Sequence, residues 1–109
     1  MARPNPRYRN GHRRREIRTR VLAEETHCAL CGRPVDTDLP AGLPASPEVD
    51  EDIPVSRGGS PYSRSNTTLM HRACNNWKSN RTLAEARAAL AGSTAKRPAP
   101  APIAHSGTW

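Results

Sequence analysis

The chain has 109 residues, of which only 14 are Leu, Ile or Val and none is Phe, about 13% of the whole. A chain of this size and composition forms at most one domain with a small apolar core, which excludes a doubly wound sheet, a barrel and a deep apolar substrate pocket. No stretch approaches the ~18 apolar residues of a membrane span, and the first twenty residues lack the apolar segment of a secretory signal. We therefore expect a fold that needs help beyond hydrophobic burial, such as a bound metal.

The formal net charge of +7 lies entirely in the first twenty residues, which hold eight arginines and one acidic residue. A basic segment of this kind binds polyanions without reading their sequence. We expect residues 1–12 to form an extended, mobile arm, and Arg13, Arg14 and Arg15 are candidate contacts to nucleic acid. The alternative is a solvated segment that only keeps the protein soluble.

Four further elements are predicted along the chain. Residues 13–25 are expected to be a helix, because their apolar residues fall on one side and arginines cover the rest. The segment 34–47 holds four prolines and one glycine and is expected to be a loop. Residues 48–55 alternate as a strand, and residues 67–70 are predicted to pair with it as a hairpin with a long connection.

The remaining predictions concern the C-terminal half. Val49 and Ile53 are expected on the same face of the first strand, and residues 74–79 are predicted to begin a helix. Thr82 and Glu85 have the spacing of a capping box, which opens another helix. The sequence thus predicts three parts: a basic disordered arm (1–12), a folded domain (13–92) and a disordered Ala/Pro-rich tail (93–109).

Cysteine and histidine occur in two pairs with the same two-residue spacer, Cys28 with Cys31 and His71 with Cys74. The odd number of cysteines argues against a disulfide framework. Zinc accepts thiolate or imidazole at each corner of a tetrahedron, so these four residues predict a structural zinc site with no open position. His27 is a competing ligand that we expect to point away, and the alternative to a metal is a set of reduced, buried thiols.

The segment between the two pairs carries an acidic cluster, Glu48, Asp50, Glu51 and Asp52, four carboxylates in five residues. Packing them together costs repulsion unless a cation or a basic neighbour compensates. On a strand, Asp50 and Asp52 would face one way and Glu51 the other. The cluster suits a hard cation such as magnesium or manganese. The alternative is a solvated acidic turn paired with nearby arginines.

Residues 26–80, about half of the chain, resemble the zinc-knuckle branch of the HNH endonucleases, in particular small members encoded by bacteriophages. The resemblance is carried by the Cys28–Cys31 pair, by Val49-Asp50-Glu51-Asp52-Ile53-Pro54-Val55-Ser56-Arg57-Gly58-Gly59, by Asn66, and by His71-x-x-Cys74-Asn75-Asn76-Trp77-Lys78. It implies a small α+β fold with a ββα-metal unit, a hairpin and a helix that grip one divalent cation and cut DNA. It also implies a protein of the bacterial host cytoplasm that needs no small-molecule cofactor and no membrane.

The resemblance implies a role for each matching residue. Asp50 matches the metal-binding Asp, Asn75 the final ligand of a catalytic Mg²⁺ or Mn²⁺, and Asn66 the residue that holds the base in position. Glu51 stands where the family usually has its general base, a histidine. It is expected to accept a proton from water, or else to join Asp50 as a second metal ligand. His71 replaces the more frequent third cysteine of the zinc site.

Arg57, Arg72 and Lys78 are predicted contacts to the DNA backbone, each with the alternative of a solvated surface base. Trp77 is expected to pack in the core. Two other functions remain open at this stage. One is a zinc module that binds DNA, or assists phage packaging proteins, without cutting. The other is an adaptor whose basic arm docks onto an acidic protein.

Overall fold

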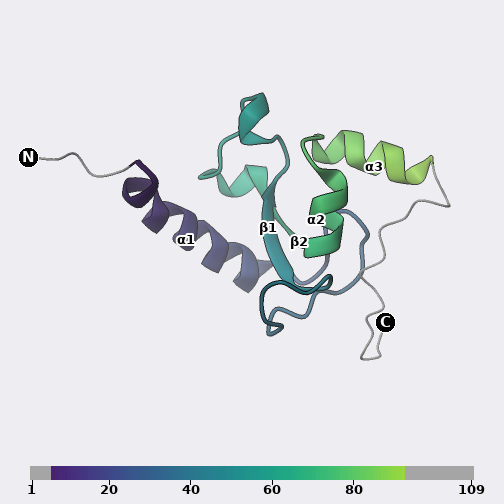
Figure 1. Cartoon of the computed structure of the whole chain (residues 1–109), viewed down its shortest axis with the longest axis horizontal. Helices are drawn as coiled ribbons and strands as arrows, with labels where there is room; N and C mark the ends of the chain where they lie inside the picture. The colour runs from purple at the N-terminus through teal and green to yellow at the C-terminus, as the bar shows by residue number, and fades with distance from the viewer. Residues whose placement is uncertain (1–5, 93–109) are drawn as a thin grey trace, which may run out of the picture.

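The computed structural model describes residues 6–92, with side chains from residue 11 on, and these form a small α+β fold around a two-stranded antiparallel sheet (Figure 1). Helix α1 lies on one side of the hairpin, and α2 and α3 lie on the other. The predicted tail, 93–109, and residues 1–5 of the predicted arm lie outside the described residues. Within the described part of the chain, no helix has the length and apolar character to cross a bilayer.

Helix α1 spans Pro6–Glu24, so residues 6–12 are helical where the sequence predicts an extended arm. Proline is tolerated in the first turn of a helix, because its missing N–H would have no partner there. Gly11 weakens a helix by roughly 1 kcal/mol without ending it. Pro6 and Gly11, from which the sequence predicts an extended arm, are therefore compatible with a helix at these positions.

The C-terminal half of α1 is fixed to the rest of the molecule by packing and by ion pairs. Ile17 and Val21 are buried against the hairpin. The Arg64 guanidinium donates to Glu24 Oε1 and to Glu25 Oε2, each at 2.8 Å. Acidic residues at a helix C-terminus oppose the helix dipole, and Arg64 offsets this cost.

The hairpin consists of β1 (Pro47–Glu51) and β2 (Thr67–His71), with Val49 opposite Leu69. The second strand is confirmed, whereas the first ends four residues earlier than predicted. Asn66 causes this early end. Its Oδ1 accepts the N–H of Ile53 at 2.9 Å, and its Nδ2 donates to the Ile53 carbonyl at 3.1 Å, which turns the chain out of the strand. Ile53 is consequently 46% exposed, and the expectation that it shares the buried face of Val49 is wrong.

Helix α2 (Arg72–Lys78) follows β2 directly, and α3 (Leu83–Ala91) follows α2 after a short turn. The capping box of α3 is confirmed, since Glu85 N donates to Thr82 Oγ1 and Thr82 N donates to Glu85 Oε1. Leu83 N donates to the carbonyl of Asp52 at 2.8 Å, which joins the start of α3 to the end of β1. The predicted loop over 34–47 contains no helix, and β1 begins at its last residue.

The core is small and combines few aliphatic side chains with cysteines. Its buried apolar members come from α1, the segment after it, β2, α2 and α3, and they are Ile17, Val21, Cys28, Leu30, Val35, Leu69, Met70, Cys74, Leu83 and Ala86. Trp77 packs against this cluster, as predicted, with the Arg81 guanidinium 4.5 Å from the centre of its ring. Two of the ten buried apolar residues are cysteines. The stability of the core therefore depends on whether their sulfurs are bound to a metal.

Gly59 is predicted to be irreplaceable in the connection between the strands. A Cβ at this position would overlap the carbonyl oxygen of Ile53 and would lie 2.8 Å from Asn66 Nδ2. We expect Gly59→Ala to lower the free energy of unfolding by about 1–3 kcal/mol, measured by urea denaturation. Gly92→Ala is the control, because its nearest neighbour would lie at 3.6 Å. Equal stability of the two variants would contradict this account of the connection.

Candidate metal centre and hairpin site

The two Cys/His pairs, 40 residues apart in the chain, meet in one cluster. One ligand atom each from Cys28, Cys31, His71 and Cys74 lies within 4.8 Å of the other three. His71 Nδ1 is 3.4 Å from Cys31 Sγ and 3.8 Å from Cys74 Sγ. Three sulfurs and one imidazole nitrogen at these distances could bind a structural metal such as zinc.

Local structure explains how each pair is presented. Gly32 N donates to the Cys28 carbonyl at 2.9 Å, and Cys28 N donates to the Arg33 carbonyl at 2.8 Å, which closes a tight knuckle. Gly32 has φ +78°, a conformation that favours glycine and lets the chain turn directly after Cys31. The second pair joins the end of β2 to the first turn of α2. Ala29 N donates to the Leu69 carbonyl, so the knuckle is also attached to β2.

The orientation of His71 suits metal binding. Its ring is fully buried, and Nε2 lies 2.9 Å from the carbonyl oxygen of Pro34. Nε2 therefore carries the hydrogen, and the Nδ1 lone pair points to the sulfurs. A ligating histidine normally donates its other ring N–H in this way, which fixes the tautomer. Pro34 thus contributes to the site through its backbone.

Electrostatics within the cluster also favour a bound cation. Hydrogen bonds from the Cys31 and Cys74 thiols lower the pKa of the Cys28 thiol. Hydrogen bonds to Cys28 and Cys31 raise the pKa of the Cys74 thiol. Burial opposes a charge on His71, but hydrogen bonds to Cys28 and Cys31 outweigh burial and raise its pKa to about 9. Metal-free protein thus keeps protons where a cation would bind, so metal and protons compete for the cluster.

His27 is not part of the cluster, as predicted. It is exposed, and its Nδ1 lies 2.8 Å from Thr26 Oγ1. The three cysteines are free of disulfides, and all of them lie in the cluster. The donor set is therefore complete with four protein ligands, and it offers no open position to a substrate.

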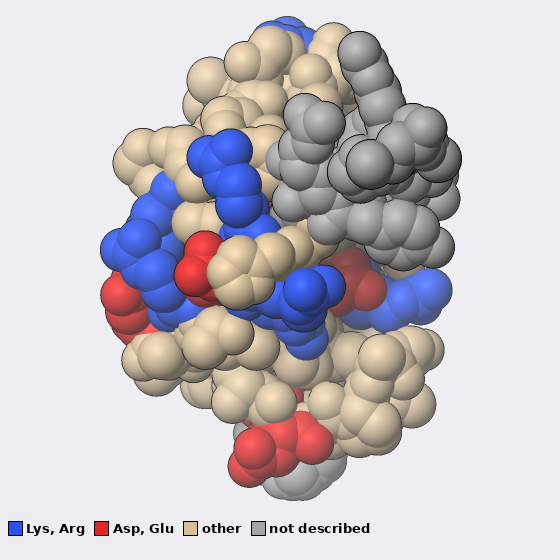
Figure 2. Space-filling model, turned by 90° about the vertical axis from the view of Figure 1, so that its left-hand side faces the viewer, with Lys and Arg blue, Asp and Glu red and all other residues tan. Residues whose placement is uncertain are grey.

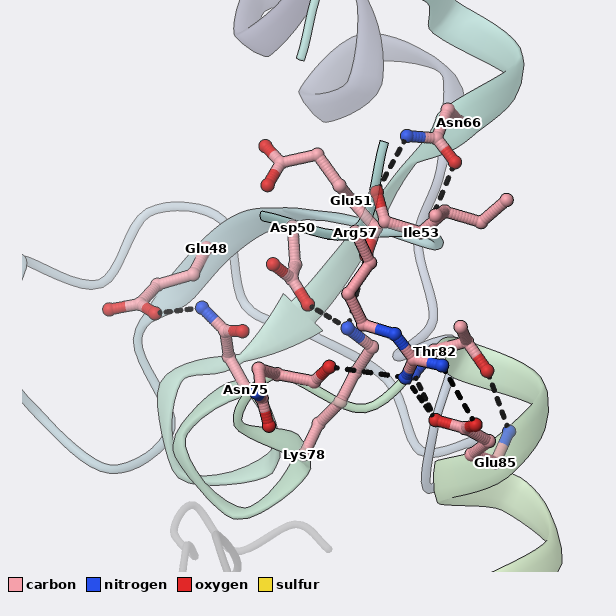
Figure 3. A network of polar contacts seen from close by, with 11 residues as sticks. Glu48, Asp50, Glu51, Ile53, Arg57, Asn66, Asn75, Lys78, Thr82 and Glu85 are labelled. Atoms are coloured by element: carbon pink, nitrogen blue, oxygen red, sulfur yellow. Dashed lines mark hydrogen bonds and ion pairs between the residues drawn. The ribbon is translucent and has the colours of Figure 1, made fainter. Parts of the chain in front are cut away.

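A second group of polar residues lies where β1 faces α2 (Figure 3). Asp50 Oδ2 is 2.8 Å from Lys78 Nζ, and Lys78 Nζ also donates to the carbonyl of Glu51 at 3.0 Å. Next to this pair, Asn75 Nδ2 donates to Glu48 Oε1 at 2.8 Å. We call Glu48, Asp50, Asn75 and Lys78 the seam. The structure thus brings together Asp50 and Asn75, the two residues predicted to hold a catalytic cation.

Lys78 is the main correction to the predicted site. Its side chain is completely buried, so it does not reach the phosphate that the sequence analysis assigned to it. Burying an ammonium group is costly unless a counter-charge and hydrogen bonds compensate, and the Asp50 carboxylate with the Glu51 carbonyl supplies both. Part of the acidic cluster is thereby neutralised by the protein itself.

Glu51 and Asn66 lie away from the seam. Glu51 points to the opposite face of β1 from Asp50, as strand alternation predicts, and Figure 3 shows it directed away from Lys78. Burial and the charge of Asp50 raise the pKa of Glu51 above its usual value. Asn66 bonds to the backbone of Ile53 and Ser60, so it positions the chain after Glu51 instead of contacting the carboxylate.

The other predicted DNA contacts divide into two groups. Arg57 forms a two-pronged ion pair with Glu85, at 2.5 and 3.2 Å, which lowers the pKa of Glu85 to about 2. Arg72 Nε lies 3.5 Å from Glu48 Oε2. By contrast, Arg13, Arg14 and Arg15 are exposed on α1 and make no ion pair with any residue that the structure describes.

The sequence places Glu48 in the acidic cluster without a role of its own, and it gives no indication of Tyr62. Glu48 is the partner of Asn75 and Arg72. It lies two positions before Asp50 on the strand, so alternation could have placed it on the same face as Asp50. Tyr62 lies under two arginines, with the guanidinium carbons of Arg13 and Arg14 at 4.4 and 5.7 Å from its ring centre. No pattern in the sequence connects Tyr62 to residues that lie 48 positions or more before it.

Comparisons of the chain with protein-family models, with curated proteins and with solved structures found no match. The relation to HNH endonucleases therefore stays a proposal that rests on the motifs of the sequence.

We expect the purified protein to contain one zinc ion per chain and to unfold when a chelator removes it. Cys28→Ser should abolish stoichiometric zinc and the cooperative thermal transition, because folding and metal binding are coupled in so small a core. Metal content by mass spectrometry and unfolding by circular dichroism measure both effects. His27→Ala is the matched control and should keep zinc and stability. A zinc-free protein with an unchanged transition would rule out a structural metal.

Lys78→Met is predicted to destabilise the fold by about 3–5 kcal/mol, because it leaves the Asp50 carboxylate largely buried and uncompensated. Urea denaturation at neutral pH measures this cost. The double variant Lys78→Met/Asp50→Asn removes both charges and should recover most of the loss. A double variant no more stable than the single one would show that packing of the lysine stem matters, not the ion pair.

Proposed function

We propose that the protein is a metal-dependent endonuclease of the HNH type that hydrolyses phosphodiester bonds in DNA. The observation that supports this proposal is the seam itself. Consecutive elements β1, β2 and α2 form a hairpin followed by a helix, and oxygen donors of Glu48, Asp50 and Asn75 lie together between β1 and α2. The Cys/His cluster fixes the junction of β2 and α2, and with it the position of Asn75 relative to β1.

The donor chemistry of the seam fits a hard divalent cation. Carboxylate and amide oxygens are the ligands that magnesium and manganese prefer. Asp50 Oδ2 lies 2.8 Å from Lys78 Nζ as an ion pair, but this buried oxygen accepts no hydrogen bond of good geometry from the described residues. Asp50, Asn75 and Glu48 would hold the cation. When bound there, Mg²⁺ or Mn²⁺ supplies a Lewis acid that polarises the phosphate and stabilises the leaving oxygen.

Glu51 would act as the general base in this proposal. The attacking water gives a proton to the Glu51 carboxylate, its oxygen bonds to phosphorus, and the bond from phosphorus to the leaving oxygen breaks. The raised pKa of Glu51 makes it a stronger base than a surface glutamate, although weaker than a histidine. Asn66 is a positioning residue, because it fixes the backbone just after Glu51. The scissile phosphate would lie at the end of β1, between the two faces of the strand.

The test is nicking of supercoiled plasmid by the zinc-loaded protein with Mg²⁺ or Mn²⁺. Asn75→Ala and Glu51→Gln are expected to reduce the rate by a factor of about 10² or more, as the loss of one group acting in the transition state does. The rate of the native protein should rise with pH through the raised pKa of Glu51, since only the carboxylate accepts a proton. That dependence should disappear in Glu51→Gln.

Glu16→Gln is the matched control for this test, because it removes an exposed carboxylate from α1 and should leave the rate unchanged. Zinc content and circular dichroism of each variant would show that the fold is retained. The nuclease assignment fails if the native protein does not cut with either cation, or if cutting is indifferent to both substitutions.

A zinc module that binds DNA without cutting it is the second candidate, and the Asp50–Lys78 pair favours it. An ammonium group already neutralises the carboxylate that a catalytic cation would need, and Glu51 faces away from the seam. Such a module could assist phage packaging proteins. It predicts retained DNA binding with no cleavage at any magnesium or manganese concentration.

A further inference from the structure

The basic side chains of the described residues differ in their partners. Arg57, Arg64, Arg72 and Lys78 each form an ion pair with a carboxylate of another element. The arginines at 13, 14, 15 and 18 of α1 form none with any described residue. A base that already has a carboxylate partner must lose it to bind a phosphate, whereas an unpaired one loses only water. Arg81 and Arg87 also have no carboxylate partner among the described residues, but Arg81 lies over Trp77 and Arg87 donates to the Ala29 carbonyl. The largest group of unpaired arginines close together in the chain therefore lies on α1.

The unpaired arginines do not all face the same way. Arg14 and Arg18 are four residues apart, on one side of α1, and line a groove of about 160 Å³ between α1 and β1. Arg13 and Arg14 lie over the ring of Tyr62, which follows the groove residue Pro61 in the chain. Arg13 and Arg15 line a second groove on α1, of about 700 Å³, together with Tyr62. Figure 2 shows Lys and Arg side chains in a band across this end of the molecule, with single acidic groups between them.

Tyr62 makes this surface better suited to binding than a set of free arginines. A guanidinium held over an aromatic ring loses less conformational freedom when it binds an anion. Glu51 is the acidic residue of the groove, and two arginines line the groove with it, so the lining keeps a positive excess. The groove has two guanidinium groups in its lining and no aromatic ring on which a base could stack, which points to the backbone of the nucleic acid.

We infer that Arg13, Arg14 and Arg18 of α1, together with Tyr62, form the docking surface for the phosphodiester backbone of duplex DNA, with a phosphate seated in the groove beside Glu51. This inference rests on the proposed function for its choice of DNA as the partner. It replaces the predicted contacts of Arg57, Arg72 and Lys78 on the other side of the hairpin. Recognition is by backbone charge and does not depend on base sequence.

The experiment is fluorescence anisotropy of a short labelled duplex over a range of NaCl concentrations, in buffer to which no Mg²⁺ or Mn²⁺ is added. The zinc-loaded full chain is used, and retained zinc is verified for every variant. Arg14→Ala/Arg18→Ala is expected to bind on the order of tenfold more weakly and to reduce the salt slope by about 1.8, since each lost phosphate contact removes about 0.9. Tyr62→Ala should weaken binding with a smaller change of slope, because it removes no charge.

Arg57→Ala/Arg72→Ala is the matched control. It removes the same charge from two positions that are already paired with carboxylates, and should change affinity less than twofold. Equal losses in the two double variants would overturn the inference in favour of binding by net charge alone. Tighter binding of a poly-glutamate peptide than of DNA would also overturn it. Because cleavage needs Mg²⁺ or Mn²⁺ and neither is added, failure of the nuclease proposal and failure of this docking surface are separate results.

Discussion

Contact between the knuckle at Cys28 and Cys31 and the hairpin end at His71 and Cys74 is the constraint on which the rest of the molecule depends. These residues join segments that are 40 positions apart, and they include two of the ten buried apolar residues. Few aliphatic side chains are available to hold α1, the hairpin and α2 together. A metal bound by three sulfurs and one nitrogen would supply that free energy directly. The geometry of the seam and of the α1 groove depends on this junction, because it holds α1, the hairpin and α2 together.

The fold reduces the repulsion among the carboxylates of the acidic cluster. Strand alternation sends Glu48 and Asp50 to α2 and Glu51 to α1, which separates charges that are adjacent in the chain. On the α2 side, Lys78 and Asn75 complement the carboxylates. The result has two consequences for function. The carboxylates on the α2 side form a group of oxygen donors suited to a divalent cation. The Lys78 ammonium lies among them and reduces the need for a bound metal ion.

Much of the architecture could be predicted from local signals. The capping box of Thr82 and Glu85, the second strand and the two Cys/His pairs depend on residues within a few positions of one another, and the structure bears them out. The predicted strand ending at residue 55 is wrong because Asn66, far along the chain, binds the backbone of Ile53. The start of α1 also differs, because Pro6 in the first turn and Gly11 in the following turn do not exclude a helix.

The sequence by itself determined the ligand types, the charge distribution and the alternation of the acidic strand, since spacing and composition carry this information. Only the tertiary structure decided which charges are available to a partner. Lys78 and Arg57 look like surface bases in the sequence, yet Asp50 and Glu85 neutralise them. Tyr62 gains its place beside the α1 arginines only when the connection folds back onto that helix. Pairing between distant elements has no local signature, because it depends on the path of the whole chain.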